Sequence, residues 1–270
     1  MFRKIITFPT FFICQLFSFA GDNNIGARSA GMGNSSVTLS DVWSTGNNQA
    51  GLAYLKSISA GVCYDDRFLL LGLGLKGAAI AIPTKAGVFG ISTIAFGNKL
   101  YSENKYGLAF SKTFGPAVSA GVQLDYLNTK IAEGYGSVGA PVMEMGVQVK
   151  LTKQLTLGSH LFNPTRAKLA DYNNERIPTF MRFGFAYIFS EKVFIDAEIQ
   201  KDILFKPLFK FGLEYNPKKE FYLRTGFSTD PAKSTFGFGV LIKKIKFDLA
   251  SSFDSVLGFT PNAGLIYIVE

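Results

Sequence analysis

The 270-residue chain has little of what catalysis and metal binding require. It contains one histidine, His160, and two cysteines, so a histidine-based zinc site or an acid–base dyad lacks a second member. Ser159 adjoins His160, but neighbouring residues of a strand point to opposite faces, which argues against a nucleophile–base pair. The sequence has no Walker motif, dinucleotide fingerprint or CxxC. We therefore expect no enzyme activity, no metal site and no cofactor.

Charge is also scarce, at 18% of residues, whereas hydrophobic residues make up 47% and phenylalanine alone occurs 27 times. This composition excludes a disordered chain. Beyond the N-terminus no run approaches the roughly 20 apolar residues of a spanning helix, which excludes a helical membrane protein. The net charge of +8 is spread over turns rather than gathered in one block, so we expect no nucleic-acid partner.

Residues 1–20 have the three parts of a secretory signal peptide: the basic Arg3 and Lys4, an apolar run, and small residues at Ser18 and Ala20. We predict cleavage after Ala20. Cys14 leaves with the signal, so Cys63 alone remains and no intrachain disulfide can form. The sequence thus predicts an exported chain.

From residue 57 onward the dominant pattern is period-2 alternation in short segments separated by turn residues, which indicates strands with one apolar and one polar face. The expected length of a strand that crosses a bilayer at a tilt is about 9–11 residues. We predict an all-β fold, an antiparallel transmembrane β-barrel of about 14 strands. The expected strands are 57–64, 69–82, 87–96, 106–114, 118–127, 141–151, 154–162, 179–190, 193–201, 206–215, 221–228, 235–242, 245–252 and 262–269.

The links between these segments alternate in length. Links after even-numbered strands are short, such as 152–153 and 243–244, whereas the longest, 128–140 and 163–178, follow odd-numbered strands. Short periplasmic turns and longer external loops are typical of outer-membrane barrels. Aromatic residues near the strand ends fit the girdles at the two lipid interfaces. We predict the outer membrane of a Gram-negative cell, with both termini periplasmic and membrane lipid as a partner.

The segment before the strands does not alternate. It runs Gly26-Ala27-Arg28-Ser29-Ala30-Gly31-Met32-Gly33, has Asp41 before Trp43, and ends Asn48-Gln49-Ala50-Gly51-Leu52. These motifs resemble the N-terminus of the FadL-like outer-membrane barrels, particularly the PorV/PorQ type. Gln49 stands where proline is commoner in that group. The resemblance implies a segment folded into the barrel lumen as a hatch.

The domain organisation expected from this resemblance is a signal peptide (1–20), an N-terminal plug segment (21–56) and an outer-membrane barrel (57–270). Glycines recur on the expected inner faces, and a lumen partly filled by another piece of chain explains them. The alternative explanation is that small residues merely permit the curvature of the barrel.

The positive and negative charges expected on the inner face are equal in number, which indicates paired charges that brace the lumen. They are Lys76, Lys150, Arg182, Lys210, Arg224, Lys246, Asp125, Glu144, Asp196, Glu198, Glu214 and Asp248. The candidate plug and lumen residues are Arg28, Asp41, Trp43, Asn48, Gln49, Arg182, Asp196, Glu198 and Arg224.

Three functions remain open. The PorV/PorQ resemblance implies a role in type IX protein secretion, with secreted proteins or secretion-system components as partners, and this is the main prediction. The FadL resemblance implies instead a plugged channel for uptake of hydrophobic small molecules. A passive or structural barrel is the third reading. An apolar lumen pocket formed by Phe162, Phe180 and Ile188 would favour the second.

Overall fold

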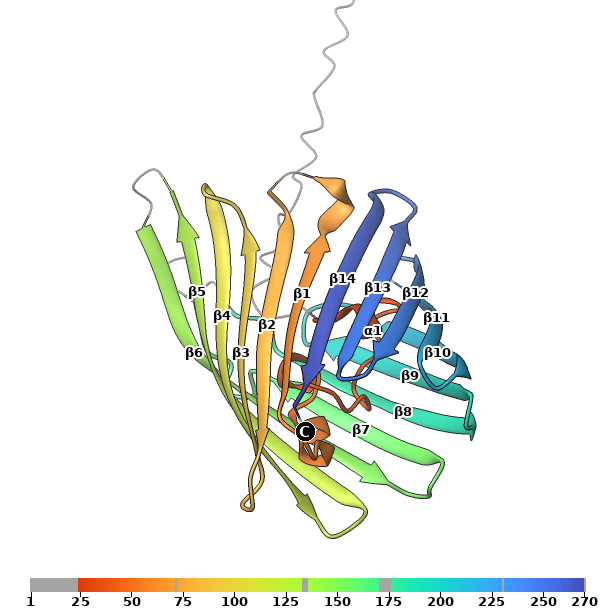
Figure 1. Cartoon of the computed structure of the whole chain (residues 1–270). Coiled ribbons are helices and arrows are strands. Elements are labelled where there is room, and N and C mark those ends of the chain that lie inside the picture. The colour runs from red at the N-terminus through yellow and green to blue at the C-terminus, as the bar shows by residue number, and fades with distance from the viewer. Residues whose placement is uncertain (1–23, 71, 133–135, 170–175, 230, 270) are drawn as a thin grey trace, which may run out of the picture.

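The computed structural model describes residues 24–70, 72–132, 136–169, 176–229 and 231–269, so the predicted signal peptide lies outside the described residues. Fourteen antiparallel strands form a closed barrel in which each strand pairs with its neighbours along the chain and β14 pairs with β1 (Figure 1). The predicted fold class and strand number are confirmed. No helix within the described ranges is long and apolar enough to cross a membrane.

The strands follow the chain around the barrel without a crossover. They are β1 (Ser59–Asp66), β2 (Gly74–Pro83), β3 (Val88–Gly97), β4 (Tyr101–Phe114), β5 (Val118–Ile131), β6 (Gly136–Lys150), β7 (Leu155–Phe162), β8 (Phe180–Ser190), β9 (Val193–Asp202), β10 (Leu208–Lys218), β11 (Phe221–Ser228), β12 (Lys233–Ile242), β13 (Ile245–Asp254) and β14 (Gly258–Ile268).

Alternation along each strand separates an apolar outer wall from a polar inner wall. On β8, Met181, Phe183 and Phe185 are exposed on the outside, whereas Arg182 between them is buried in the lumen. The outward side chains of β4 are apolar from Tyr106 to Phe110 and polar at Asn104 and Lys112 on either side. At about 3.4 Å per residue and a tilt of about 40°, these limits enclose roughly 20 Å of barrel height, close to the band of a membrane barrel.

Two sequence predictions differ from the structure. The link between β5 and β6 is short, because β5 extends to Ile131 and β6 begins at Gly136, with pairs such as Asn128 and Gly139 continuing the ladder. Polar side chains alternate here because the hairpin extends beyond the apolar band.

Lys76 was expected on the inner face, but it is exposed on the outer face, opposite Tyr64 and Ala95 in the register. Small residues occupy both faces of β2, so its alternation does not reveal which face is inside.

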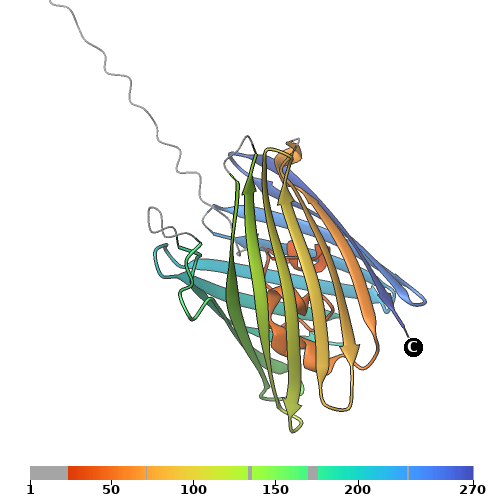
Figure 2. The ribbon, with the colours of Figure 1, turned by 90° about the vertical axis from the view of Figure 1, so that its left-hand side faces the viewer.

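The N-terminal residues lie inside the ring of strands (Figures 1 and 2). They form α1 (Ala27–Ala30), α2 (Ser44–Asn47) and the 3₁₀ helix η1 (Gln49–Tyr54), from which the chain enters β1; a second 3₁₀ helix, η2 (Arg67–Leu69), follows β1. Most side chains from Ile25 to Leu52 are buried, many of them without any exposed surface. We refer to residues 24–56 as the lumen segment.

Inner-wall glycines follow the path of the lumen segment. A Cβ added at Gly212 would lie 2.6 Å from Cβ of Met32, and one at Gly121 would lie 2.6 Å from the backbone carbon of Gln49. Since real Cβ atoms do not approach other atoms so closely, the segment can reach the wall only where the wall has no side chain. The same holds at Gly61, Gly146, Gly158, Gly184 and Gly226, all of which were expected on the inner face.

Candidate functional site in the barrel lumen

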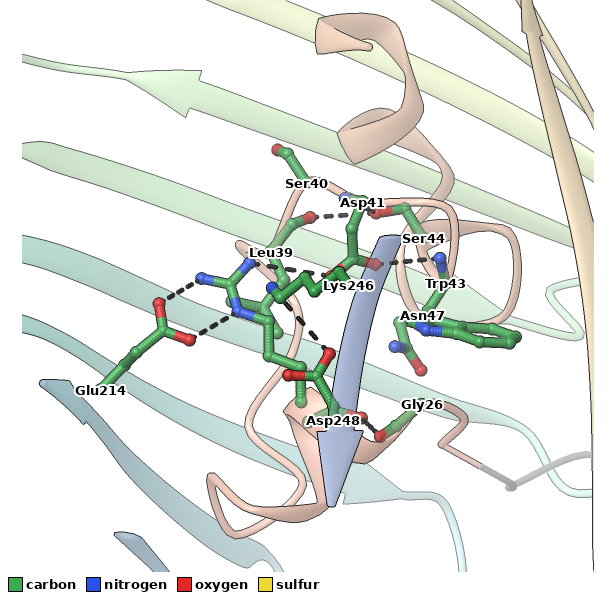
Figure 3. A network of polar contacts seen from close by, with 12 residues as sticks. Gly26, Leu39, Ser40, Asp41, Trp43, Ser44, Asn47, Glu214, Lys246 and Asp248 are labelled. Atoms are coloured by element: carbon green, nitrogen blue, oxygen red, sulfur yellow. Dashed lines mark hydrogen bonds and ion pairs between the residues drawn. The ribbon is translucent and has the colours of Figure 1, made fainter. Parts of the chain in front are cut away.

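Arg28 of α1 anchors the lumen segment to the wall formed by β10, β11 and β13. Its Nε and Nη2 donate to the two carboxylate oxygens of Glu214 at 2.9 and 2.8 Å, and Nη1 lies 3.7 Å from Asp41 of the same segment. Arg224 donates to Glu214 and to Asp248, both at 2.7 Å, and Lys246 lies 4.0 Å from Asp248. Figure 3 shows Asp41 of the segment together with Glu214, Lys246 and Asp248 of the wall.

This ion-pair chain is buried and nearly balanced in charge. Burial alone would lower the pKa of Arg28, but the carboxylates of Glu214 and Asp41 more than offset this and raise it, so the guanidinium stays charged. Removing one partner of a buried pair costs about 3–5 kcal/mol, because the other charge is left uncompensated. Arg28 therefore pairs with one of the expected lumen acids, Glu214, whereas Asp196 and Glu198 bind a different part of the segment.

Asp196 and Glu198 on β9 hold the turn that follows α1. The side chains of Ser35 and Thr38 donate to Asp196, and the backbone N–H groups of Ser36 and Val37 both donate to one oxygen of Glu198 at 2.9 Å. The other oxygen of Glu198 accepts from Lys210 at 2.8 Å. Arg182 is in the same layer, where it lies 3.8 Å from Glu198 and donates to the carbonyl of Asn47 at 3.4 Å. Glu198, Lys210 and Arg182 therefore each have an opposite charge beside them, whereas two hydroxyl groups hold Asp196.

Asn48 binds the first half of the lumen segment, and Gln49 fixes the second half to β6. Asn48 donates to the carbonyl of Val37 at 2.6 Å, which ties the two halves of the segment together. Gln49 donates to Glu144 at 2.6 Å. Glu144 also binds Lys105 and lies 2.9 Å from Nε2 of His160, so the single histidine belongs to a buried hydrogen-bonded cluster. Among the described residues no group of three or more His, Cys, Asp or Glu side chains could hold a metal ion.

The opposite side of the lumen segment is apolar. Trp43 is almost fully buried, and its backbone N–H donates to the Asp41 carboxylate at 2.9 Å, which orients the start of α2. We call the contact of this side with the wall the apolar seam. The segment contributes Ile25, Val42, Trp43 and Leu52, and the wall of β1–β4 and β14 contributes Cys63, Leu75, Ala79, Ala81, Val88, Ile94, Ala109 and Ile266.

A second apolar group, which we call the mouth cluster, lies at the end of the barrel where the odd-numbered strands finish. Phe162 and Phe180 stack with ring centroids 4.9 Å apart. Around them pack Leu127, Ala140, Val142, Leu169 and Ile177, the last two from the link between β7 and β8. Asn163 folds this link inward by donating to the carbonyls of Ile177 and Pro178. Ile188, expected beside Phe162 and Phe180, lies at the other end of β8 and is exposed.

The mouth cluster contacts the cations that hold the lumen segment. Nζ of Lys105 lies 5.1 Å from the centroid of Phe162, and the guanidinium of Arg182 lies 4.8 Å from that of Phe180. Lys105 was not among the expected inner-face charges, because the expected strand began at residue 106. The alternation of Glu103, Lys105 and Gly107 would have extended that strand and placed Lys105 inside.

Solved structures with this fold include two toluene transporters and a FadL homologue. The toluene transporter TbuX of Ralstonia pickettii has a TM-score of 0.70 at 12% identity, covering 91% of this chain and 98% of that chain. The Pseudomonas putida toluene transporter TodX has 0.69 at 12% identity, covering 91% and 96%. A Pseudomonas aeruginosa FadL homologue has 0.62 at 13% identity, covering 92% and 98%. No protein-family model and no curated protein matches the chain.

At these identities the similarity establishes a shared fold, so the predicted FadL-like barrel is confirmed at that level. Two of these neighbours are described as toluene transporters, and the absence of enzyme activity in this chain stays a prediction. The narrower PorV/PorQ resemblance stays a prediction.

Proposed function

We propose that this protein is an outer-membrane channel for hydrophobic small molecules, closed at rest by its lumen segment. The observation that carries the proposal is the two-sided contact of that segment. Ion pairs and hydrogen bonds tether it to β6, β9, β10 and β12, whereas the apolar seam faces β1–β4 and β14. Apolar contacts have no directional requirement, so a hydrophobic molecule can replace them along the seam. The toluene transporters named above support this substrate class.

Entry begins at the mouth cluster. A hydrophobic molecule that separates Phe162 from Phe180 also moves these two rings relative to the cations of Lys105 and Arg182 that contact them. Lys105 binds the Glu144 carboxylate that receives Gln49, and Arg182 donates to the carbonyl of Asn47. Occupancy of the mouth thereby loosens two tethers of the lumen segment, which links substrate arrival to opening.

The membrane position follows from the apolar outer band. The mouth cluster lies at the end of the barrel that carries the longer links, and we place this end outside the cell. β1 begins and β14 ends at the opposite end, which carries the short turns, so in this orientation the chain termini face the periplasm.

A reversible cross-link tests whether passage requires the lumen segment to move. A Cβ at Gly264 would lie 3.4 Å from Cβ of Ala27, close to the roughly 3.5–4.5 Å that a disulfide spans. The pair Ala27→Cys and Gly264→Cys should therefore lock α1 to β14. Cys63 must be replaced by Ala, because its Cβ lies only 3.8 Å from the new Cβ at position 264.

The assay is naphthalene uptake by cells with a lipopolysaccharide-containing outer membrane. Expression of the unlocked chain should increase uptake, oxidation of the cysteine pair should abolish the increase, and a reductant should restore it. The Cys63→Ala chain without the pair is the matched control and should not respond to oxidation. Uptake that never exceeds that of cells lacking the protein would refute the proposed function. Uptake that the cross-link leaves unchanged would refute the role of the segment.

Type IX secretion is the second candidate, supported by the PorV/PorQ-type motif and by apolar side chains on the external links. Leu204 and Val256 are 81% and 84% exposed, although both lie beyond the apolar band. A secreted protein or a secretion-system component could cover such residues. Leu204→Asp and Val256→Asp should then reduce export of cell-surface proteins without changing naphthalene uptake, and unchanged export would remove this candidate. The similar structures support the channel more than secretion.

A further inference from the structure

An apolar groove lies on the outer wall over β1–β5. Its volume is about 670 Å³, and Val62, Ala78, Ile80, Thr93, Tyr106 and Leu108 are among its lining residues. Ala78 and Thr93 are directly paired across β2 and β3, and Val62 and Tyr106 flank them in the same row. Two small side chains between two larger ones make a depression, and the row of Ile80, Ile91 and Leu108 continues the apolar surface below it.

Polar side chains occupy the row of outward residues next to this groove on the side of the external links. The next outward row contains Lys76 on β2, Ala95 on β3 and Asn104 on β4. Lys76 is therefore two residues along the strand from Ala78 and on the same face, about 7 Å away. The row from Tyr64 to Asn128 contains no acid, and the nearest acid on this face, Asp66, is opposite Gly74 one row further out. The groove thus has an apolar floor and one cation with an amide at its interfacial end.

This arrangement matches an amphipathic molecule with an apolar chain and a phosphate at one end. A lysine at the membrane surface attracts an anionic headgroup by an amount that corresponds to about a fivefold change in binding. The side-chain amide of Asn104 can donate to phosphate oxygens beside Lys76. A neutral hydrocarbon would gain nothing from either group, which favours a lipid over a transported substrate as the occupant.

We propose that this groove is a specific site for a phosphorylated membrane lipid, with one acyl chain over Ala78 and Thr93 and the phosphate at Lys76 and Asn104. The site rests on the outer-membrane position in the proposed function, but not on transport. The external orientation of this end makes lipid A the lipid to test.

Native mass spectrometry of the full chain in mild detergent measures the site directly. With added lipid A, the wild-type protein should retain one lipid more strongly than it retains phosphatidylcholine, whose choline neutralises the phosphate. Lys76→Gln should weaken retention about fivefold. Ala78→Phe should abolish it by filling the groove, and Thr93→Leu should weaken it for the same reason. Lys112→Gln is the matched control, because Lys112 lies on the same outer face at the opposite edge of the apolar band.

Three results would overturn the site: equal retention of the two lipids, an equal loss in Lys76→Gln and Lys112→Gln, or displacement of lipid A by naphthalene. A gel shift between unheated and heated samples of each variant shows that the barrel has folded, so a folding failure is not mistaken for lost binding. Lipid retention without naphthalene uptake would uphold this site and refute the transport function, whereas uptake without retention would do the reverse.

Discussion

Replacing Gly121 by alanine should force the lumen segment away from the wall. Gly121 is on the inner face of β5, where its added Cβ would lie 2.6 Å from the backbone carbon and 2.8 Å from the backbone oxygen of Gln49. Ordinary contact begins at 3.4 Å, so the two chains must separate by about 0.8 Å. The obstacle is backbone, which cannot rotate away as the end of a side chain can.

The size of the effect follows from the cost of overpacking, about 1–3 kcal/mol. Because the strand is held by neighbours on both sides and the segment only by its tethers, the segment should give way. Its displaced population should therefore rise roughly 5- to 150-fold. Gly264→Ala is the matched control, since the same atom added on β14 would meet Cβ of Ala27 at an ordinary 3.4 Å.

Planar-bilayer conductance measures this displacement. A barrel of 14 strands without its lumen segment leaves a water-filled interior, so the intact protein should conduct poorly. Gly121→Ala should open far more often than the wild type, and Gly264→Ala should behave as the wild type does. A folded Gly121→Ala barrel that conducts no more than the wild type would refute the displacement of the segment, and so would an equal gain of conductance in both variants.

Three further outcomes are expected. Arg28→Ala breaks the buried pair with Glu214 at a cost of about 3–5 kcal/mol, so bilayer recordings should show more frequent openings than the wild type. An unchanged recording would mean that the other tethers suffice to hold the lumen segment in place. Trp43→Ala leaves a cavity in the apolar seam that costs about 3–5 kcal/mol, so heating should convert the folded gel band to the unfolded one at a lower temperature than in the wild type. A tag at Val256 should be labelled on intact cells and a tag at Lys243 should not; the reverse pattern would invert the barrel.

The sequence by itself determined the fold class, because period-2 alternation and alternating link lengths are local properties of a barrel strand and its turns. For inner-face glycines such as Gly121 and Gly212 the sequence left two explanations open, a piece of chain in the lumen or the curvature of the barrel. The single histidine and the low content of charged residues left few catalytic alternatives. These are counts of residues, so they require no knowledge of which side chains meet in the folded protein.

Only the tertiary structure decided which groups meet. Alternation assigns a side chain to one face of one strand, but the height of that side chain in the barrel depends on the register of all the strands between it and its partner. For this reason Arg28 meets Glu214 rather than Asp196, and Phe162 meets Phe180 while Ile188 lies at the far end of β8. Lys76 was assigned to the wrong face for a related reason. Small residues lie on both faces of β2, so the sequence does not show which face is inside. The pairing of Lys76 with Tyr64 and Ala95 places its side chain on the outer face.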